Sequence, residues 1–325
     1  MKYIVLVIVT CALFVLDCVW GKEPIMWSEI LEGGTFSHEI IMNFRLPRAV
    51  TSILVGISLS VSGLLMQTIF RNPLAGPYIL GVSSGGSLGV AIFMLSGGSV
   101  AISWLASVGV VSSAWIGAAV VLLIVMAISV RIKDIMAILI LGMMIGSVAS
   151  AIVGLLQIFS TDSALKGFVI WSMGSLGSSS WAEILVMFFC VLGGLGITVC
   201  KIKSLDLLLL GENYARTLGL RVTQTRALIF LATAILAGGI TAFCGPIAFV
   251  GIVAPHIARM IFKEASHRVL VVGSSLVGMA MMLLCDVISN MPLFVSVLPI
   301  NSIASMLGIP IVIMVVVGSR KSKIM

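Results

Sequence analysis

Long apolar runs, separated by short polar breaks, make up most of the chain. The runs are close to the ~20 residues that a helix needs to cross the hydrocarbon core of a membrane, whereas a membrane barrel shows alternating strands of ~10 residues. The pattern therefore predicts an all-α, polytopic membrane protein with about ten transmembrane helices. The expected spans are residues 3–20, 45–69, 78–96, 100–130, 135–159, 181–201, 223–244, 247–262, 268–290 and 300–318.

The polar breaks leave no room for a second domain. The longest of them are residues 21–44, 160–180 and 202–222, which are too short to bury a core of their own. We therefore expect residues 1–325 to form a single transmembrane domain. In the second break, Trp171 and Trp181 suit a membrane interface, which predicts a short helix near the outer surface.

The composition agrees with this class and the charge distribution orients the chain. Of the 325 residues, 60% are hydrophobic and 10% are charged, against roughly a quarter charged in soluble domains. All but four of the 19 Lys and Arg residues fall on the side that holds both termini, the exceptions being Lys22, Arg45, Arg48 and Lys166. The positive-inside rule therefore places both termini in the cytoplasm. Because topology explains the net charge of +7, no nucleic-acid partner is expected.

Small residues recur at every fourth position in three of the predicted spans. The stripes are Ser52, Gly56 and Ser60; Gly81, Gly85 and Gly89; and Gly142, Gly146, Ser150 and Gly154. Such a stripe lies on one face of a helix and lets a neighbouring backbone approach closely. Two interpretations are open, namely tight helix packing or a face that borders a path of changing width. On the second interpretation the path-lining residues are Gly146, Ser147, Ser150 and Gly154.

The stretch RNPLAGPYILGVSSGG, residues 71–86, interrupts the apolar pattern. Pro73 and Pro77 disfavour helical geometry at the residues before them, so a rigid reversal of the chain is expected after the second span. In lipid, irregular backbone is tolerated only where protein buries it or water reaches it, which indicates a cavity or a gate. An ordinary loop is the alternative.

Residues 45–86, RLPRAVTSILVGISLSVSGLLMQTIFRNPLAGPYILGVSSGG, closely resemble the signature of the FecCD family. The segments LLLLGENYARTLGL (207–220), CGPIAFVGIVAPHIARMIF (244–262), SHRVL (266–270) and LGIPIVI (307–313) resemble its later blocks, in order. These proteins are the permease subunits of ABC importers for iron-siderophores, haem and vitamin B12. The resemblance implies a type II ABC importer permease fold, a homodimer with the substrate path along its axis, two cytoplasmic ATPase subunits and an external substrate-binding protein.

The third polar break, about 202–222, looks like the coupling segment of that family. Gly211 and Gly219 can end helices and Glu212 suits a first helical turn, so a compact helical protrusion is expected. The resemblance implies that the protrusion docks in a groove of the ATPase. The implied contacts are Glu212, Tyr214, Ala215, Arg216, Leu218 and Gly219. A solvated loop is the alternative. The chain has no P-loop motif, so ATP is assigned to the separate ATPase subunit and no cofactor is expected on this chain.

Arg45 and Arg48 lie at the outer end of the second span, against the positive-inside bias. Guanidinium groups at a rim can form forked bonds with carboxylates of an incoming protein, and the resemblance implies docking of the binding protein here. Asn290 stands where the vitamin B12 branch has an Arg, so rearranged docking chemistry is expected. Snorkelling, or contact with lipid headgroups, is the alternative for the two arginines. Asp286, inside an apolar span, is expected to anchor helices by hydrogen bonds.

The resemblance places the cytoplasmic constriction near Asn72, Leu74, Ile135 and Met136. In the APHIAR segment, Pro255 is expected to break the helix and His256 to make a structural hydrogen bond, with haem ligation as the alternative. The six Cys and 19 Met residues show no ligand spacing, so no metal site is expected.

The residues and the resemblance together predict a permease that moves an iron chelate by alternating access, with haem or vitamin B12 as alternative cargo. A secondary transporter driven by an ion gradient would need acidic or His relays at mid-membrane, which the spans hardly offer. No constellation of nucleophile, base and metal indicates an enzyme. We expect a multi-pass protein of the bacterial cytoplasmic (inner) membrane, surrounded by lipid.

Overall fold

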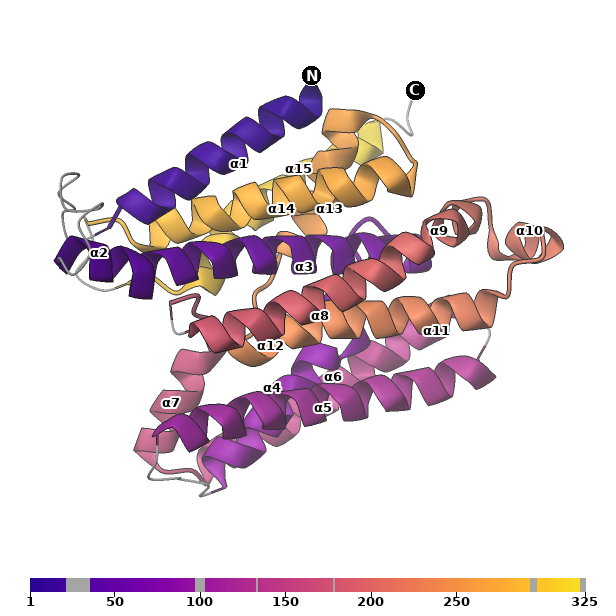
Figure 1. The fold of residues 1–325 in the computed structure, drawn as a ribbon. Helices are drawn as coiled ribbons and strands as arrows, with labels where there is room; N and C mark the ends of the chain where they lie inside the picture. Colours follow the sequence, from indigo (N-terminus) through magenta and orange to yellow (C-terminus); the bar gives the residue numbers. More distant parts are fainter. Residues whose placement is uncertain (22–35, 97–102, 133, 178, 293–296, 322–325) are drawn as a thin grey trace.

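The computed structural model describes residues 1–21, 36–96, 103–132, 134–177, 179–292 and 297–321. These residues are helical, with no strand among them, and most of the predicted break 21–44 lies outside them. The helices run along one another in a single bundle (Figure 1). They are α1 (Lys2–Val19), α2 (Phe36–Ile40), η2 (Ile41–Arg45), α3 (Leu46–Phe70), η3 (Pro77–Leu80), α4 (Val82–Leu95), α5 (Ser103–Arg131), α6 (Ile135–Ile158), α7 (Asp162–Ser172), α8 (Trp181–Cys200), α9 (Ile202–Leu209), α10 (Glu212–Thr217), α11 (Val222–Thr233), η4 (Ala234–Gly238), α12 (Gly239–Cys244), α13 (Val250–Phe262), α14 (His267–Ser289) and α15 (Ile300–Lys321).

Seven helical stretches in the described residues are long and apolar enough to cross a membrane. They are Lys2–Val19, Phe36–Phe70, Val108–Ser129, Ile135–Ile158, Trp181–Cys200, Val222–Cys244 and His267–Ser289. Three shorter apolar helices, Val82–Leu95, Val250–Phe262 and Ile300–Met314, fall on the remaining predicted spans. Every expected span therefore contains an apolar helix, while ten complete crossings stay a prediction.

The central helix is α3, which is buried along almost its whole length. Two of its glycines explain how neighbours come so close. A Cβ on Gly56 would lie 2.4 Å from the carbonyl oxygen of Gly278 in α14, and a Cβ on Gly63 would lie 1.7 Å from that of Gly251 in α13. Side chains cannot be accommodated at such distances, so the stripe that includes Gly56 serves helix packing.

The stripe at the start of the third predicted span has the same role. A Cβ on Gly85 would lie 2.6 Å from the carbonyl oxygen of Gly117, and one on Gly89 would lie 2.0 Å from that of Ser113. Both partners belong to α5, so α4 and α5 pack backbone to backbone. Tight packing is therefore the interpretation that holds for these two stripes.

The seventh predicted span is a helix in three parts, because the π-helical turn η4 separates α11 from α12. A π-turn carries one more residue than an α-turn and shifts the hydrogen-bond pattern of the backbone. The hydroxyl of Ser58 in α3 donates to the carbonyl of Leu236 within η4 at 2.8 Å, and both residues are fully buried. A side chain of the central helix thus satisfies a carbonyl of the irregular turn.

The two ends of the bundle can be told apart by their contacts. At one end, which carries α9 and α10, the ring of Tyr3 near the start of α1 packs 4.5 Å from that of Phe262 at the end of α13. At the opposite end, which carries α2 and α7 (Figure 1), Arg45 bonds the last carbonyls of α1. Following the predicted orientation, we call these the inner end and the outer end.

Candidate functional site

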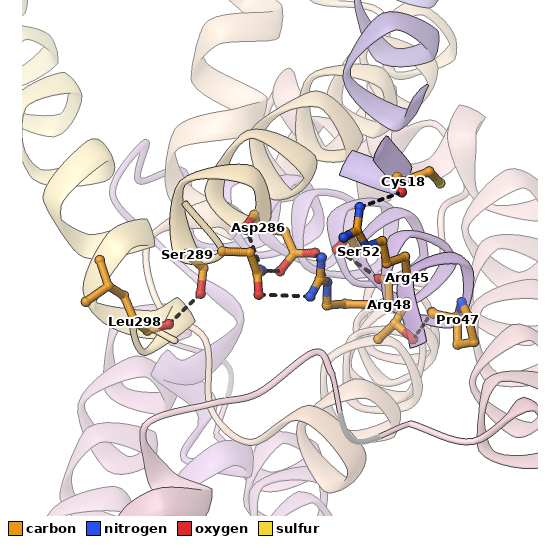
Figure 2. A network of polar contacts seen from close by, with 10 residues as sticks. Cys18, Arg45, Pro47, Arg48, Ser52, Asp286, Ser289 and Leu298 are labelled. Atoms are coloured by element: carbon orange, nitrogen blue, oxygen red, sulfur yellow. Dashed lines mark hydrogen bonds and ion pairs between the residues drawn. The ribbon is translucent and has the colours of Figure 1, made fainter. Parts of the chain in front are cut away.

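Two helices meet in a polar network at the outer end (Figure 2). The Arg48 Nε atom of α3 lies 2.8 Å from Asp286 Oδ2 in α14, and its Nη1 donates to Asn290 Oδ1 at 2.8 Å. The Asn290 amide donates in turn to the backbone carbonyl of Asp286 at 2.8 Å and to its Oδ1 at 2.9 Å. Asp286 is only 2% exposed. The network therefore fixes α3 against α14 with one buried ion pair and its supporting amide.

The outer network leaves one donor of Arg48 unused. Its Nη2 atom is buried and has no hydrogen-bond partner among the described residues. Arg48 also lines a cavity of about 560 Å³, bounded by the outer ends of α3, α7 and α14 and by the start of α15. Its polar lining includes Arg48, Asp286, Ser289 and Asn290, and its apolar lining includes Phe44, Ile170, Met173, Val297 and Leu298. Such a cavity can accept a side chain that carries a hydrogen-bond acceptor.

Arg45 does not lie at an open rim as expected, because it is 4% exposed. Its guanidinium donates to the backbone carbonyls of Cys18 and Val19, and it lies 3.4 Å from the first of these oxygens. These carbonyls end α1, where a cation is favourable to the helix dipole. Arg45 therefore ties the first helix to the segment before α3 (Figure 2).

Asp17, near the outer end of α1, is 1% exposed. Both of its carboxylate oxygens are buried without a hydrogen-bond partner among the described residues. It interacts electrostatically with Asp286 and Arg48. The cluster at the outer end thus contains a second buried carboxyl group, which the apolar pattern of the first span does not reveal.

The predicted coupling segment forms the two short helices α9 and α10 at the inner end (Figure 1). Glu212 pairs with Arg226 of α11, and it lies 3.7 Å from Arg216 one turn further along α10. Tyr214 and Leu218 are 58% and 54% exposed. Ala215 is fully buried, and Gly219 ends the segment with a left-handed φ of 85°. Of the six predicted contact residues, Tyr214 and Leu218 therefore present apolar surface, whereas the carboxylate of Glu212 holds α10 in place.

Sequence reasoning missed the roles of four residues that attach α9 to the bundle. Asp206 Oδ1 lies 2.6 Å from His267 Nδ1, and the other ring nitrogen of His267 lies 2.7 Å from the hydroxyl of Thr68. Arg71 Nη2 donates to the carbonyl of Leu208 at 2.6 Å. The sequence offered one signal for these contacts, namely ionisable residues near the ends of predicted spans. One of them, His267, lies in the segment SHRVL.

The chain reverses direction after α3, as the two prolines predict. Arg71 adopts a left-handed φ of 47°, and the side chain of Asn72 accepts a hydrogen bond from the Leu74 backbone nitrogen at 2.9 Å. Pro77 then opens the short helix η3. The hydroxyl of Tyr78 in this helix accepts from the Ile247 backbone nitrogen at 3.0 Å. The irregular backbone is thus satisfied by side chains of the protein itself.

The four predicted gate residues occupy two neighbourhoods. Leu74 is 38% exposed and borders a small recess. The recess is lined by Pro73, Leu74, Ile252, Val253, His256, Ile311 and Val312, and Ile135 and Met136 are not among its described lining residues. These two residues begin α6, where the side chain of Asp134 accepts from the Met136 backbone nitrogen at 2.9 Å.

The small residues predicted to line the path on α6 fall into two groups, one packed against a neighbouring helix and one exposed. A Cβ on Gly146 would lie 3.2 Å from the hydroxyl of Ser84 in α4, so this glycine packs against a neighbour. Ser147 and Ser150 are exposed, and nothing lies within 4 Å of a Cβ on Gly154. Only the second group is available to border a path, and Gly154 is the position at which an added side chain meets open space.

Pro255 does not break its helix, which corrects the expectation. Helix α13 runs continuously from Val250 to Phe262 with the proline inside it. Because Pro255 lies in the second turn, it removes a single hydrogen bond, the one that would reach the carbonyl of Gly251. The expected hydrogen bond of His256 is also missing at Nδ1, which is buried without a partner among the described residues. Among all the residues that the structure describes, no group of three or more His, Cys, Asp or Glu side chains could hold a metal ion.

Comparison with known proteins agrees with a bundle of this kind. The profile of the FecCD transport family matches residues 6–318. The hemin transport system permease protein HmuU of Yersinia pestis is 35% identical over 285 residues, which cover 87% of this chain and 85% of HmuU. The vitamin B12 import system permease protein BtuC of Escherichia coli O9:H4 is 34% identical over 281 residues, which cover 86% and 84%.

A solved structure has the same fold. It shows an inward-facing metal-chelate type ABC transporter, with a TM-score of 0.86, 30% sequence identity and coverage of 98% of both chains. In class, therefore, the protein is a multi-pass transport permease of the membrane. The extent of the profile match and the identity to HmuU and BtuC define the group more closely. The chain belongs to the FecCD transport family.

Proposed function

We propose that the chain is the permease subunit of an ATP-driven ABC importer in the cytoplasmic membrane and that its cargo is an iron chelate of the siderophore type. It works as a homodimer with two cytoplasmic ATPase subunits and an external substrate-binding protein. The observation that carries the proposal is the likeness over 98% of the chain to a metal-chelate type ABC transporter. Both termini face the cytoplasm, in agreement with the distribution of Lys and Arg.

The inner end receives the ATPase through α9 and α10. Tyr214 and Leu218 leave more than half of their surfaces exposed on the short helix and the turn that follows it. Exposed apolar side chains beside charged ones are typical of a docking surface. The pair between Glu212 and Arg226 holds this surface in a fixed orientation to α11. Arg216 lies 44% exposed on the same helix and is available to the partner.

The outer end receives the binding protein at the cavity beside Arg48. Arg48 lines this cavity, and its guanidinium supports docking of an acidic or carbonyl group there. Asn290 already uses its amide on Asp286, so it supports the site by positioning Arg48. Arg45 contributes by holding α1 beside the docking surface. The docking chemistry is rearranged because Arg48 already forms an ion pair with Asp286 of the same chain.

The path itself runs along the homodimer axis, bordered by the exposed face of α6 that includes Ser147 and Ser150. Leu74, on the irregular turn at the inner end, supports a constriction there because it is exposed on a rigid segment. Movement driven by the ATPase opens and closes this constriction. The path binds its cargo weakly, since large chelates need tolerance of shape, and no metal ligand set occurs among the described residues.

Haem or vitamin B12 is the second candidate cargo. It is favoured by one observation, the 35% and 34% identity to the hemin permease HmuU and the vitamin B12 permease BtuC. The identities are too similar to choose between the two.

The test is reconstitution in liposomes with the ATPase and binding protein encoded beside this chain. Uptake of three probes is compared: a ferric hydroxamate siderophore, haemin and cyanocobalamin. The control uses an ATPase subunit whose P-loop Lys is replaced by Ala. We expect uptake of the ferric siderophore, with ATP inside, that disappears in the control. Uptake of haemin or cyanocobalamin instead would change the proposed cargo and leave the assignment as an ABC importer permease in place. Transport by this chain alone, driven by an ion gradient, would overturn the proposal.

A further inference from the structure

Helix α9 is joined to the bundle by a chain of three polar side chains, which we call the joint. Asp206 of α9 accepts from the backbone nitrogen of His267 at 2.9 Å and lies 2.6 Å from its Nδ1. The Nε2 atom of His267, at the start of α14, lies 2.7 Å from the hydroxyl oxygen of Thr68 in α3. The joint therefore connects the coupling segment to two long helices at once.

The geometry of the joint fixes the imidazole ring. His267 is 1% exposed, and each of its ring nitrogens has one partner, so the ring cannot turn without losing a hydrogen bond. Thr68 Oγ1 also lies 2.9 Å from the carbonyl of Leu64 in the preceding turn, which holds the hydroxyl in place. A polar chain of this kind stabilises no more than well-packed apolar side chains would. What it adds is a fixed direction between the elements that it connects.

Separate contacts attach the two halves of the coupling segment to different parts of the bundle. Arg71, which follows α3, donates to the carbonyl of Leu208 near the end of α9. The joint and Arg71 thus tie α9 to α3 and α14. By contrast, Glu212 ties α10 to Arg226 of α11. A displacement of α9 acts on α3 and α14 first, because its described polar contacts lead there.

Helices α3 and α14 form one body from the inner end to the outer end. Midway, Gly56 and Gly278 bring the two backbones into direct contact. At the outer end Arg48 is paired with Asp286. Two helices that are joined at both ends and in contact between them move together, since separating them would break all three contacts.

We propose that Asp206, His267 and Thr68 are positioning residues through which a displacement of the coupling segment moves α3 and α14 as one body. The outer network around Arg48 moves with this body. The inference rests on the proposed function, because it takes α9 and α10 to be the segment that contacts the ATPase. Coupling of this kind is reciprocal. Docking of the binding protein outside therefore acts on the ATPase through the same three side chains.

Four variants test the joint. His267→Asn keeps an amide near Nδ1 for Asp206 and loses the bond to Thr68, whereas His267→Gln keeps a group near Nε2 and loses the side-chain contact with Asp206, leaving only the bond from the backbone nitrogen. Thr68→Val removes the hydroxyl at constant shape. Thr68→Ser retains the hydroxyl and is the matched control. Each of the first three variants removes one side-chain contact of the joint, so all three should have the same effect if force passes through the joint.

The readout is movement at the outer end. Phe44 is 65% exposed beside the start of α3 and is replaced by Cys for spin labelling, after removal of the four Cys residues that are not buried. The permease is reconstituted in nanodiscs with its ATPase, and the distance between labels of the two protomers is measured without nucleotide and with ATP and vanadate. ATPase stimulation by the binding protein is measured in parallel on protein that keeps Phe44, because this residue lines the outer cavity.

We expect the distance between labels to shift with nucleotide in the native joint and in Thr68→Ser. In His267→Asn, His267→Gln and Thr68→Val the shift is lost while basal ATPase activity continues. Stimulation by the binding protein falls by ~5-fold or more, the lower end of common coupling factors.

A shift that persists in these variants overturns the inference, as does an absent shift with the native joint. Either result leaves the proposed function intact. Failure of any ATPase subunit to assemble with the native chain would instead count against the proposed function. A joint that only stabilises the fold would lower thermal stability in all three variants without uncoupling them.

Discussion

Replacing Gly63 by Ala should be among the most damaging one-carbon changes in this chain. The new Cβ would lie 1.7 Å from the carbonyl oxygen of Gly251, 2.4 Å from its carbonyl carbon and 2.7 Å from its Cα. All three are backbone atoms of α13, so no rotamer change can relieve the contact. To bring 1.7 Å to a tolerable ~3.0 Å, the two helices must separate by about 1.3 Å.

That separation also disturbs a second close contact, two turns away on the same face of α3. Gly56 fixes the same helix against Gly278 of α14, where the corresponding distance is already 2.4 Å. Overpacking commonly costs ~1–3 kcal/mol, and the gain in helix propensity from Gly to Ala is at most ~1 kcal/mol. Because the clashing atoms are backbone atoms, we expect an overpacking cost at the upper end of this range and a net loss of about 2 kcal/mol in the free energy of unfolding.

The assay is thermal unfolding of the purified protein in detergent, followed by Trp fluorescence and by the fraction that remains monodisperse. The matched control is Gly193→Ala in α8, where nothing lies within 4 Å of the new Cβ. It should leave stability unchanged or raise it, because Ala favours a helix over Gly. If Gly63→Ala were as stable as Gly193→Ala, the packing argument for α3 would be refuted.

Three further predictions concern the ends and the path. Arg48→Ala leaves Asp286 buried without its cation and should cost ~3–5 kcal/mol in unfolding experiments, whereas Arg216→Ala, which removes a partly exposed pair, should change stability little. Ser150→Trp should slow uptake in liposomes without lowering thermal stability, because the side chain points away from the described packing. Arg226→Met removes the buried cation that holds α10 and should weaken co-purification with the ATPase, with Arg216→Met as the comparison.

Each of these has an outcome that contradicts it. Equal stability of the Arg48 and Arg216 variants would mean that the outer network is not a structural tie. Unchanged uptake in Ser150→Trp would mean that this face does not border the path. Full ATPase recovery with Arg226→Met would mean that the orientation of α10 does not depend on that pair.

The apolar pattern predicts the fold well because burial and membrane insertion are local properties of a run of residues. It places an apolar helix at every expected span and a reversal at Pro73 and Pro77. It fails at Pro255, because a proline inside a helix removes one hydrogen bond and a helix buried among its neighbours can tolerate that loss. The break in α13 was predicted from the residue type alone, without the packing around it.

The partners of polar residues are harder to predict from the sequence. Arg48 and Asp286 are 238 positions apart, so no spacing rule connects them, and the same holds for Thr68 and His267 at 199 positions. Arg45 was expected to face an incoming protein because of its type and its side of the membrane. Its actual partners are backbone carbonyls at the end of another helix, which carry no signature in the sequence.

The π-turn between α11 and α12 is a place where this segment can lose a residue at little cost. The turn holds one residue more than an α-turn, so deleting one residue within Ala234–Gly238 would let the backbone return to regular α-helical bonding. Side chains beyond the deletion would keep their faces, and Thr241 and Cys244 would stay buried. The same deletion in a regular α-helix would turn every later side chain by about 100° around the axis. Alignments of related chains can therefore place a one-residue gap here without exchanging inward and outward residues.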